Sequence, residues 1–112
     1  MNKDSINLPA IPLRGITIFP NMIIHFDVGR EKSISALEES MLKDSKIFLV
    51  SQIDPEIEDP KRNEIYSIGT ICKIKQILKL PKGVTRVLVE GVERAAIIDL
   101  IDDKKFKEVI VE

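Results

Sequence analysis

Residues 11–41 read IPLRGITIFPNMIIHFDVGREKSISALEESM, and this stretch decides the fold. It contains two apolar runs that are typical of β-strands, and an amphipathic segment from about Arg30 to Lys43 follows them. The apolar residues of that segment fall at helical spacing and would lie along one stripe of a helix: Ile34, Leu37 and Met41. No later stretch repeats this spacing. The sequence therefore predicts a mainly β (α+β) fold in which one amphipathic helix docks on a sheet.

Length and composition indicate one folded domain over residues 1–112. Hydrophobic residues make up 44% of the chain and charged residues 31%, which is typical of a folded domain rather than an unfolded chain. The net charge of −1 gives no general attraction to nucleic acid or to an anionic membrane. The single cysteine, Cys72, excludes an internal disulfide, and no run reaches membrane-spanning length. Because the start of the chain has no apolar leader either, we expect a cytoplasmic protein.

Six stretches are strand-like, and turn residues separate them: 8–14, 23–28, 46–52, 69–80, 85–101 and 106–111. Pro9 and Pro12 lack a backbone N–H, so the first strand is expected at an edge or at a bulge. The third strand is apolar on both faces, which predicts a central position covered on both sides. In the fourth, Cys72, Ile74, Leu78 and Leu80 share the expected core face, and Gln76 and Ile77 break the alternation. The last strand follows a turn expected at residues 102–105.

Motifs that carry catalysis or bind metal are absent from the sequence. His25 and Asp27 share one strand face, but a surface histidine is favoured over a catalytic one because no nucleophile motif accompanies them. The acidic residues from Asp54 onward imitate a calcium loop, yet Asp59 and Ile65 stand where that loop needs glycine and glutamate. The five glycines form no phosphate cradle. We therefore expect no catalytic, cofactor or metal site in these residues, and we read buried Cys72 as part of the core.

Protein binding is the remaining possibility, and two segments are candidates for it. The connection 16–22 carries Phe19 and Met22 around a Pro–Asn turn, and large apolar residues in a loop often mark protein contacts. The other reading, that Phe19 closes the end of the sheet as a core residue, is slightly favoured because few aromatic residues are available for the core. The long loop 53–66 offers the acidic residues Asp54, Glu56 and Glu58. A hairpin with five cations could also bind phosphates, but a charged solvent face is favoured because no aromatic residue is interleaved with them: Lys73, Lys75, Lys79, Lys82 and Arg86.

The order of several short motifs resembles the amino-terminal domain of the ATP-dependent protease Lon. The resemblance covers nearly the whole chain from Leu8 and is carried by these segments: Pro12–Leu13–Arg14, Phe19–Pro20–Asn21–Met22, Val28 to Ile34, Gln52 to Glu56, Ile68–Gly69–Thr70 and Val89 to Ala95. Two positions depart from the family pattern. His25 stands where proline is common, and Asp27 stands where an apolar residue is usual.

The resemblance implies a PUA-like fold, a twisted six-stranded sheet or pseudo-barrel with one helix. It also implies that this chain is a fragment that helps to capture unfolded or tagged proteins, and that it is a monomer or weak dimer by itself. The parent would be a homohexameric ATP-dependent Ser–Lys endopeptidase that degrades misfolded and regulatory proteins with ATP and magnesium. Two other functions stay open: a stand-alone PUA-like protein-interaction module, and an RNA-binding module. The chain stops inside strand-like sequence, which fits the expectation of a fragment.

Overall fold

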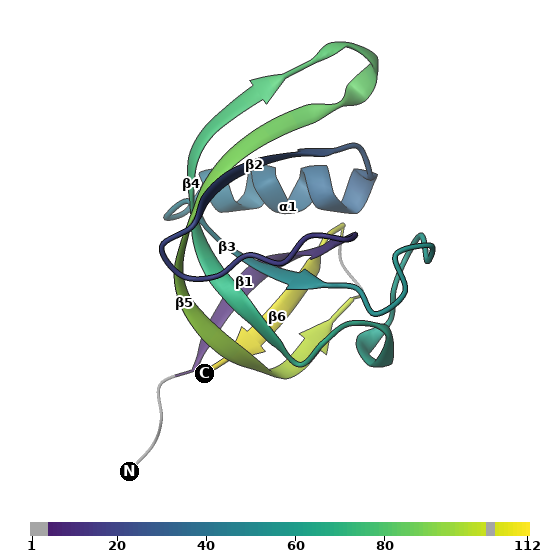
Figure 1. The fold of residues 1–112 in the computed structure, drawn as a ribbon, viewed down its shortest axis with the longest axis vertical. Coiled ribbons are helices and arrows are strands. Elements are labelled where there is room, and N and C mark those ends of the chain that lie inside the picture. Colours follow the sequence, from purple (N-terminus) through teal and green to yellow (C-terminus); the bar gives the residue numbers. More distant parts are fainter. Residues whose placement is uncertain (1–4, 103–104) are drawn as a thin grey trace.

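The computed structural model describes residues 5–102 and 105–112, which form six strands and one α-helix (Figure 1). The strands and the helix have the following bounds: β1 (Ile6–Leu13), β2 (Ile23–Val28), α1 (Glu31–Met41), β3 (Lys46–Ser51), β4 (Ile68–Lys79), β5 (Thr85–Ile101) and β6 (Lys107–Val111). Two single turns of 3₁₀-helix lie at Arg62–Glu64 and Pro81–Gly83. The predicted mainly β fold with one helix is confirmed. The turn expected at residues 102–105 includes 103 and 104, which lie outside the described residues.

The six strands form one mixed sheet in the order β2-β5-β4-β3-β1-β6. In addition, the C-terminal part of β5, residues 97–101, pairs with β6. That pairing closes five strands into a barrel. The N-terminal part of β5, residues 85–90, pairs with β2 instead. Strands β1 and β3 run parallel, and every other pair is antiparallel. The β4–β5 hairpin rises past the helix at the top of Figure 1. The expected twisted sheet or pseudo-barrel is therefore confirmed.

Two hydrophobic clusters lie on opposite faces of β1 and β3. Phe48 and Val50 point into the barrel, whereas Ile47 and Leu49 point toward the helix and β2. All four side chains are at most 2% exposed. The prediction that β3 is a central strand covered on both sides is therefore confirmed.

The prolines do not place β1 at an edge, so that prediction was wrong. Strand β1 lies between β3 and β6, but at each proline it is paired with only one of these two strands. Pro9 precedes Ala10, the first residue paired with β3, and Pro12 lies beyond the last pair with β6. The carbonyl oxygen of Pro12 accepts a hydrogen bond from Arg30 instead. A central strand can hold proline at positions where no ladder bond is required.

The helix is shorter than expected, and its buried stripe is rotated. It begins after Arg30, and its buried residues are Ser33, Ala36, Leu37 and Ser40. Met41 is 48% exposed, so its predicted place on the apolar stripe was wrong. Small side chains at these positions let the helix lie close across β1 and β3, and this close approach explains the rotation.

A bulge in β4 reverses the faces of its last residues. The register with β5 shifts between Ile74 and Gln76. As a result Ile77 packs on the core, and Leu78, predicted to face the core, is 51% exposed. The same inserted residue explains why Gln76 and Ile77 break the alternation in the sequence.

Candidate functional site

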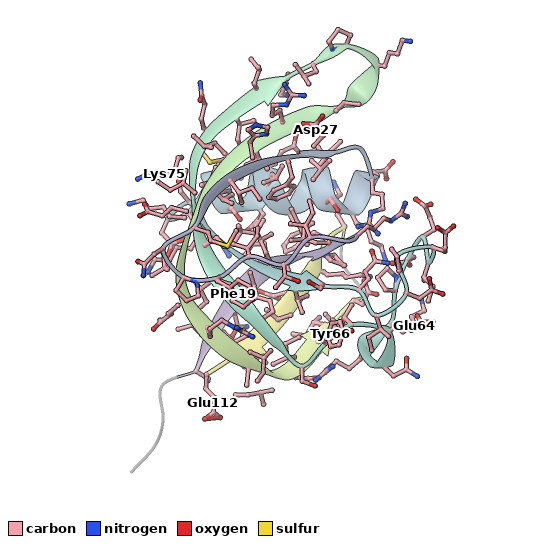
Figure 2. All side chains as sticks on the ribbon, in the orientation of Figure 1. Phe19, Asp27, Glu64, Tyr66, Lys75 and Glu112 are labelled. Atoms are coloured by element: carbon pink, nitrogen blue, oxygen red, sulfur yellow. The ribbon has the colours of Figure 1, made fainter. Side chains whose placement is uncertain are left out.

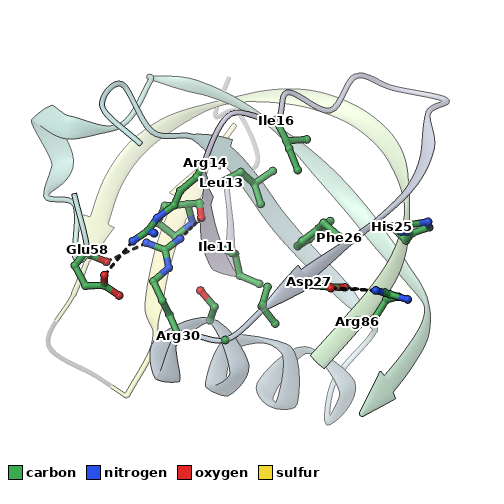
Figure 3. Close-up of a pocket in the computed structure, with 14 residues that line it drawn as sticks. Ile11, Leu13, Arg14, Ile16, His25, Phe26, Asp27, Arg30, Glu58 and Arg86 are labelled. Atoms are coloured by element: carbon green, nitrogen blue, oxygen red, sulfur yellow. Dashed lines mark hydrogen bonds and ion pairs between the residues drawn. The ribbon is translucent and has the colours of Figure 1, made fainter. Parts of the chain in front are cut away.

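A groove lies between β1 and β2 in the described part of the chain, and we call it the β1–β2 groove (Figure 3). Its volume is about 630 Å³. Apolar side chains from both strands and from the connection between them form its floor: Ile11, Leu13, Ile16, Phe26 and Val28. Charged and polar side chains surround this floor: Arg14, His25, Asp27, Arg30, Glu58 and Arg86. An apolar floor with a charged rim can bind a segment of another polypeptide.

Arg30 fixes one wall of the groove. Its guanidinium donates to the carbonyl oxygen of Pro12 at 2.6 Å, to Oε1 of Gln52 at 2.8 Å and to the carbonyl oxygen of Glu58 at 3.0 Å. Burial lowers the pKa of Arg30, and the neighbouring Arg14 lowers it further. The side chain of Gln52 in turn donates to two carbonyl oxygens of the long loop, those of Asp54 and Ile57. Because Arg30 bonds to β1 and to the loop at once, it holds these two segments together as one wall of the groove.

The opposite wall is β2, which pairs with β5 on one side only. Met22 and Gly91 face each other across this pair, since Gly91 N–H donates to the Met22 carbonyl oxygen at 2.8 Å. In an antiparallel pair the backbone groups of alternate residues face opposite sides. Those of Ile23, His25 and Asp27 therefore face away from β5, toward the free edge. Arg86 donates to the Asp27 carboxylate at 2.8 Å and lowers its pKa by that hydrogen bond.

The connection before β2 forms a tight turn at Phe19–Met22. Met22 N–H donates to the Phe19 carbonyl oxygen at 3.1 Å, and Asn21 has a φ of 72°, which defines a type II turn with Pro20 at its first corner. Phe19 is 48% exposed and carries Arg94 over its ring at 5.3 Å (Figure 2). Met22 is partly buried against the core. The two candidate residues therefore differ in their surroundings, and only Phe19 presents a large apolar surface.

The acidic candidates of the long loop separate in the structure. Glu58 lines the β1–β2 groove and pairs with Arg14 at 3.2 Å on the same side of it (Figure 3). The Asp54 carboxylate accepts from Glu56 N–H at 2.9 Å, so it stabilises the loop's own turn. Asp54 and Glu56 are exposed and do not line the groove. Of the three, Glu58 alone is placed where it could touch a molecule bound there.

A buried lysine of β6, Lys107, forms an ion pair with the same loop. The Lys107 side chain is 3% exposed, and its ammonium lies 2.6 Å from Asp59 and 2.8 Å from Asp102. Lys32 lies within 3.2 Å of the same two carboxylates. Hydrogen bonds from Lys107, and then from Lys32, lower the pKa of Asp59 to about 2 against the opposing effect of burial. We call these four residues the ion cluster. The sequence analysis missed it because its members are up to 75 positions apart in the printed sequence.

The remaining candidates are structural. Cys72 is fully buried, and burial raises the pKa of its thiol to about 12, so it is not a nucleophile. Within residues 5–102 and 105–112 no group of acidic, histidine or cysteine side chains could hold a metal ion. Two of the five hairpin cations are paired with carboxylates, Lys75 with Glu90 and Arg86 with Asp27. In the part of the chain that the structure describes, no helix has the length and apolarity needed to span a membrane.

Solved structures show the class of fold. The N-terminal domain of a Mycobacterium avium complex Lon protease superposes with a TM-score of 0.74 at 20% identity, covering 96% of this chain and 54% of that one. The Lon N-terminal domain protein of Xanthomonas campestris gives a TM-score of 0.69 at 16% identity, covering 96% of this chain and 57% of that one.

Sequence comparison shows the family. The family described as "ATP-dependent protease La (LON) substrate-binding domain" matches residues 7–112. The chain is 53% identical over 108 residues to the Lon protease of Clostridium acetobutylicum, covering 96% of this chain and 14% of that protein. It is 55% identical over 104 residues to the Lon protease of Solibacter usitatus, covering 93% of this chain and 13% of that protein. The chain belongs to the Lon substrate-binding domain family, and it spans about one seventh of these relatives' length.

Proposed function

We propose that this chain binds apolar segments of unfolded proteins and that the β1–β2 groove is the site. The observation that supports this proposal is the composition of the groove, which has an apolar floor built from two strands and a charged rim. Unfolded chains have in common that their apolar side chains are exposed, and a groove of about 630 Å³ is wide enough to take several of them.

The free edge of β2 would hold such a segment in an extended conformation. The backbone groups of Ile23, His25 and Asp27 are available there for hydrogen bonds, and backbone bonds are independent of the bound sequence. Alternate side chains of the segment would then contact the apolar floor. This arrangement favours many weakly related substrates over one specific partner.

Binding to a reduced, carboxymethylated α-lactalbumin tests the proposal, because this protein is permanently unfolded. Ile16 is a partly buried residue of the floor, and Ile16→Ser should weaken binding about fivefold or more. His25→Pro removes one N–H from the free edge and should also weaken binding. Phe19→Ser is the matched control, since Phe19 does not line this groove. If Phe19→Ser weakens binding and Ile16→Ser does not, the capture site is the Phe19 turn instead.

We further propose that the chain works as part of a longer, cytoplasmic, ATP-dependent protease, because its relatives are Lon proteases several times its length. The ATP and magnesium site, the Ser–Lys peptidase site and the contacts of a homohexamer would then belong to the parent, with misfolded and regulatory proteins as substrates. This chain alone should hydrolyse neither ATP nor casein, because the described residues offer no activated nucleophile or metal cluster. Turnover by the purified chain that a substitution within it abolishes would contradict this expectation.

A further inference from the structure

A second groove lies on the outside of the barrel, between the Phe19 turn and the start of β4, and we call it the Phe19 groove. Its volume is about 560 Å³, and it shares no lining residue with the β1–β2 groove. The proposed function does not use it. Figure 2 shows two of its residues, Phe19 and Tyr66.

The apolar surface in this groove is large and held in place. Phe19, Tyr66 and Ile68 are 48%, 52% and 51% exposed. The Phe19 turn is fixed because Asn21 N–H donates to the Gly91 carbonyl oxygen at 2.9 Å. The backbone at Tyr66, from which the side chain projects, is fixed because the Tyr66 N–H donates to the Ser51 carbonyl oxygen at 3.1 Å. Rigid aromatic side chains are the usual anchors of protein interfaces, since little conformational freedom is lost when they are covered.

Arg94 gives the groove its charge. Its guanidinium carbon lies over the Phe19 ring, 5.3 Å from the ring centroid, and this cation–π contact uses none of the N–H groups as hydrogen-bond donors. No residue in the described part of the chain accepts a hydrogen bond from this guanidinium, and Arg94 is the only charged residue that lines the groove. A second cation, Arg62, donates to the Ser67 hydroxyl at 3.1 Å at the border of the groove. The site therefore has positive charge and a free planar donor set.

We propose that the Phe19 groove binds a peptide segment in which a carboxylate lies next to an aromatic or large apolar side chain. The guanidinium edge matches the two oxygens of a carboxylate, and the ring of the ligand would lie against Phe19, Tyr66 and Ile68. Single-stranded nucleic acid also stacks on aromatic rings, but it needs a track of cations along its phosphates. The hairpin lysines without a carboxylate partner, such as Lys79, lie outside this groove. The site therefore favours a carboxylate-bearing peptide.

Two peptides and two-dimensional NMR of the isotope-labelled chain test this proposal. The first peptide is acetyl-Gly-Phe-Asp-Gly-amide, and the second has asparagine in place of aspartate. The aspartate peptide should bind with a dissociation constant on the order of 1 mM and shift the backbone signals of Phe19, Tyr66, Ile68 and Arg94. The asparagine peptide should bind about threefold to tenfold more weakly, because one charge-assisted hydrogen-bond pair is lost. Arg94→Gln should abolish this preference, whereas Lys79→Gln, which removes an equal charge on the hairpin, should keep it.

Four results would overturn the proposal. They are equal binding of the two peptides, shifts confined to the β1–β2 groove, no saturable shift at several times the expected dissociation constant, and displacement of the peptide by a uridine oligonucleotide that binds more tightly. The substitution Ile16→Ser keeps this test separate from the proposed function. It should weaken capture of unfolded protein and leave the aspartate peptide binding at the Phe19 groove unchanged.

Discussion

Replacing Lys107 by methionine should destabilise the chain by about 2 kcal/mol at neutral pH. Breaking a buried ion pair by removing one partner typically costs about 3–5 kcal/mol, since the other charge stays buried and unpaired. Here Asp59 and Asp102 are 45% and 19% exposed, so both can regain part of their hydration, and Lys32 remains close to both. Methionine also keeps most of the volume of the lysine side chain. These two effects reduce the expected cost.

Urea denaturation followed by far-UV circular dichroism measures this change. With a slope of about 1–1.5 kcal/mol per molar urea, the midpoint should fall by roughly 1.3–2 M. Lys79→Met is the matched control, because Lys79 is an exposed hairpin lysine with no ion pair in the described residues, and it should change stability by less than about 0.5 kcal/mol. If Lys107→Met is as stable as the unsubstituted chain, the ion cluster does not hold the loop in the way the distances indicate.

The pH dependence of stability gives an independent check. The pKa of Asp59 is lowered from 3.8 to about 2 in the folded chain, so its contribution to stability is present above about pH 4 and is lost as the pH falls toward 2. Burial would raise the pKa of Asp102, but hydrogen bonds from Lys107 and Lys32 together lower it, so its contribution has the same sign. Stability should therefore fall from about pH 5 to pH 2, and the fall should be shallower in Lys107→Met, where Asp59 loses its strongest partner. An equally steep fall in the variant would assign the acid sensitivity to other carboxylates.

Three further predictions concern the packing. Leu37→Ala should cost about 2–5 kcal/mol in chemical denaturation because Leu37 is 1% exposed, while Leu42→Ala, at a site that is 82% exposed, should cost less than about 0.5 kcal/mol. Gly91→Ala should lower stability by about 2–3 kcal/mol, since a Cβ there would clash with the Phe19 carbonyl oxygen and separate the turn from β5; a neutral result would show that the turn can move away. Met22→Ser should lower the melting temperature and Phe19→Ser should barely change it, because only Met22 packs on the core. The reverse order would place Phe19 in the core.

Periodicity predicted the parts of the fold that local sequence controls. The alternation in β2 correctly put His25 and Asp27 together on an exposed face, and the two-sided apolar run of β3 gave its central place in the sheet. The broken alternation at Gln76 and Ile77 was a local sign of the bulge in β4, but it was not interpreted as an inserted residue that exchanges the faces beyond it, so Leu78 was placed on the wrong face. The proline argument failed for β1 because it needs the lengths of both neighbouring ladders, and those depend on strands far away in the chain.

The candidate site was less predictable than the fold. Phe19 was singled out as a possible contact residue because its signal is local, a large side chain beside a Pro–Asn turn, but the slightly favoured reading placed it in the core, and its 48% exposure shows that reading to be wrong. The β1–β2 groove was missed because its walls come from segments that pair with different strands, and Arg30 was read only as the start of a helix. Whether the acidic loop residues Asp54 and Glu56 contact a partner stays a prediction.

The pairing of β1 with β6 has a consequence for synthesis of the chain on the ribosome. Ile6 pairs with Val111, so β1 cannot complete its second ladder until about 100 further residues have emerged. At roughly 5–20 residues per second, this takes about 5–20 s. During that interval the apolar residues of β1 are uncovered on the side that β6 will later occupy. The nascent chain thus itself resembles an unfolded protein for several seconds, and binding of a chaperone to its first strand would delay closure of the barrel without affecting the finished structure.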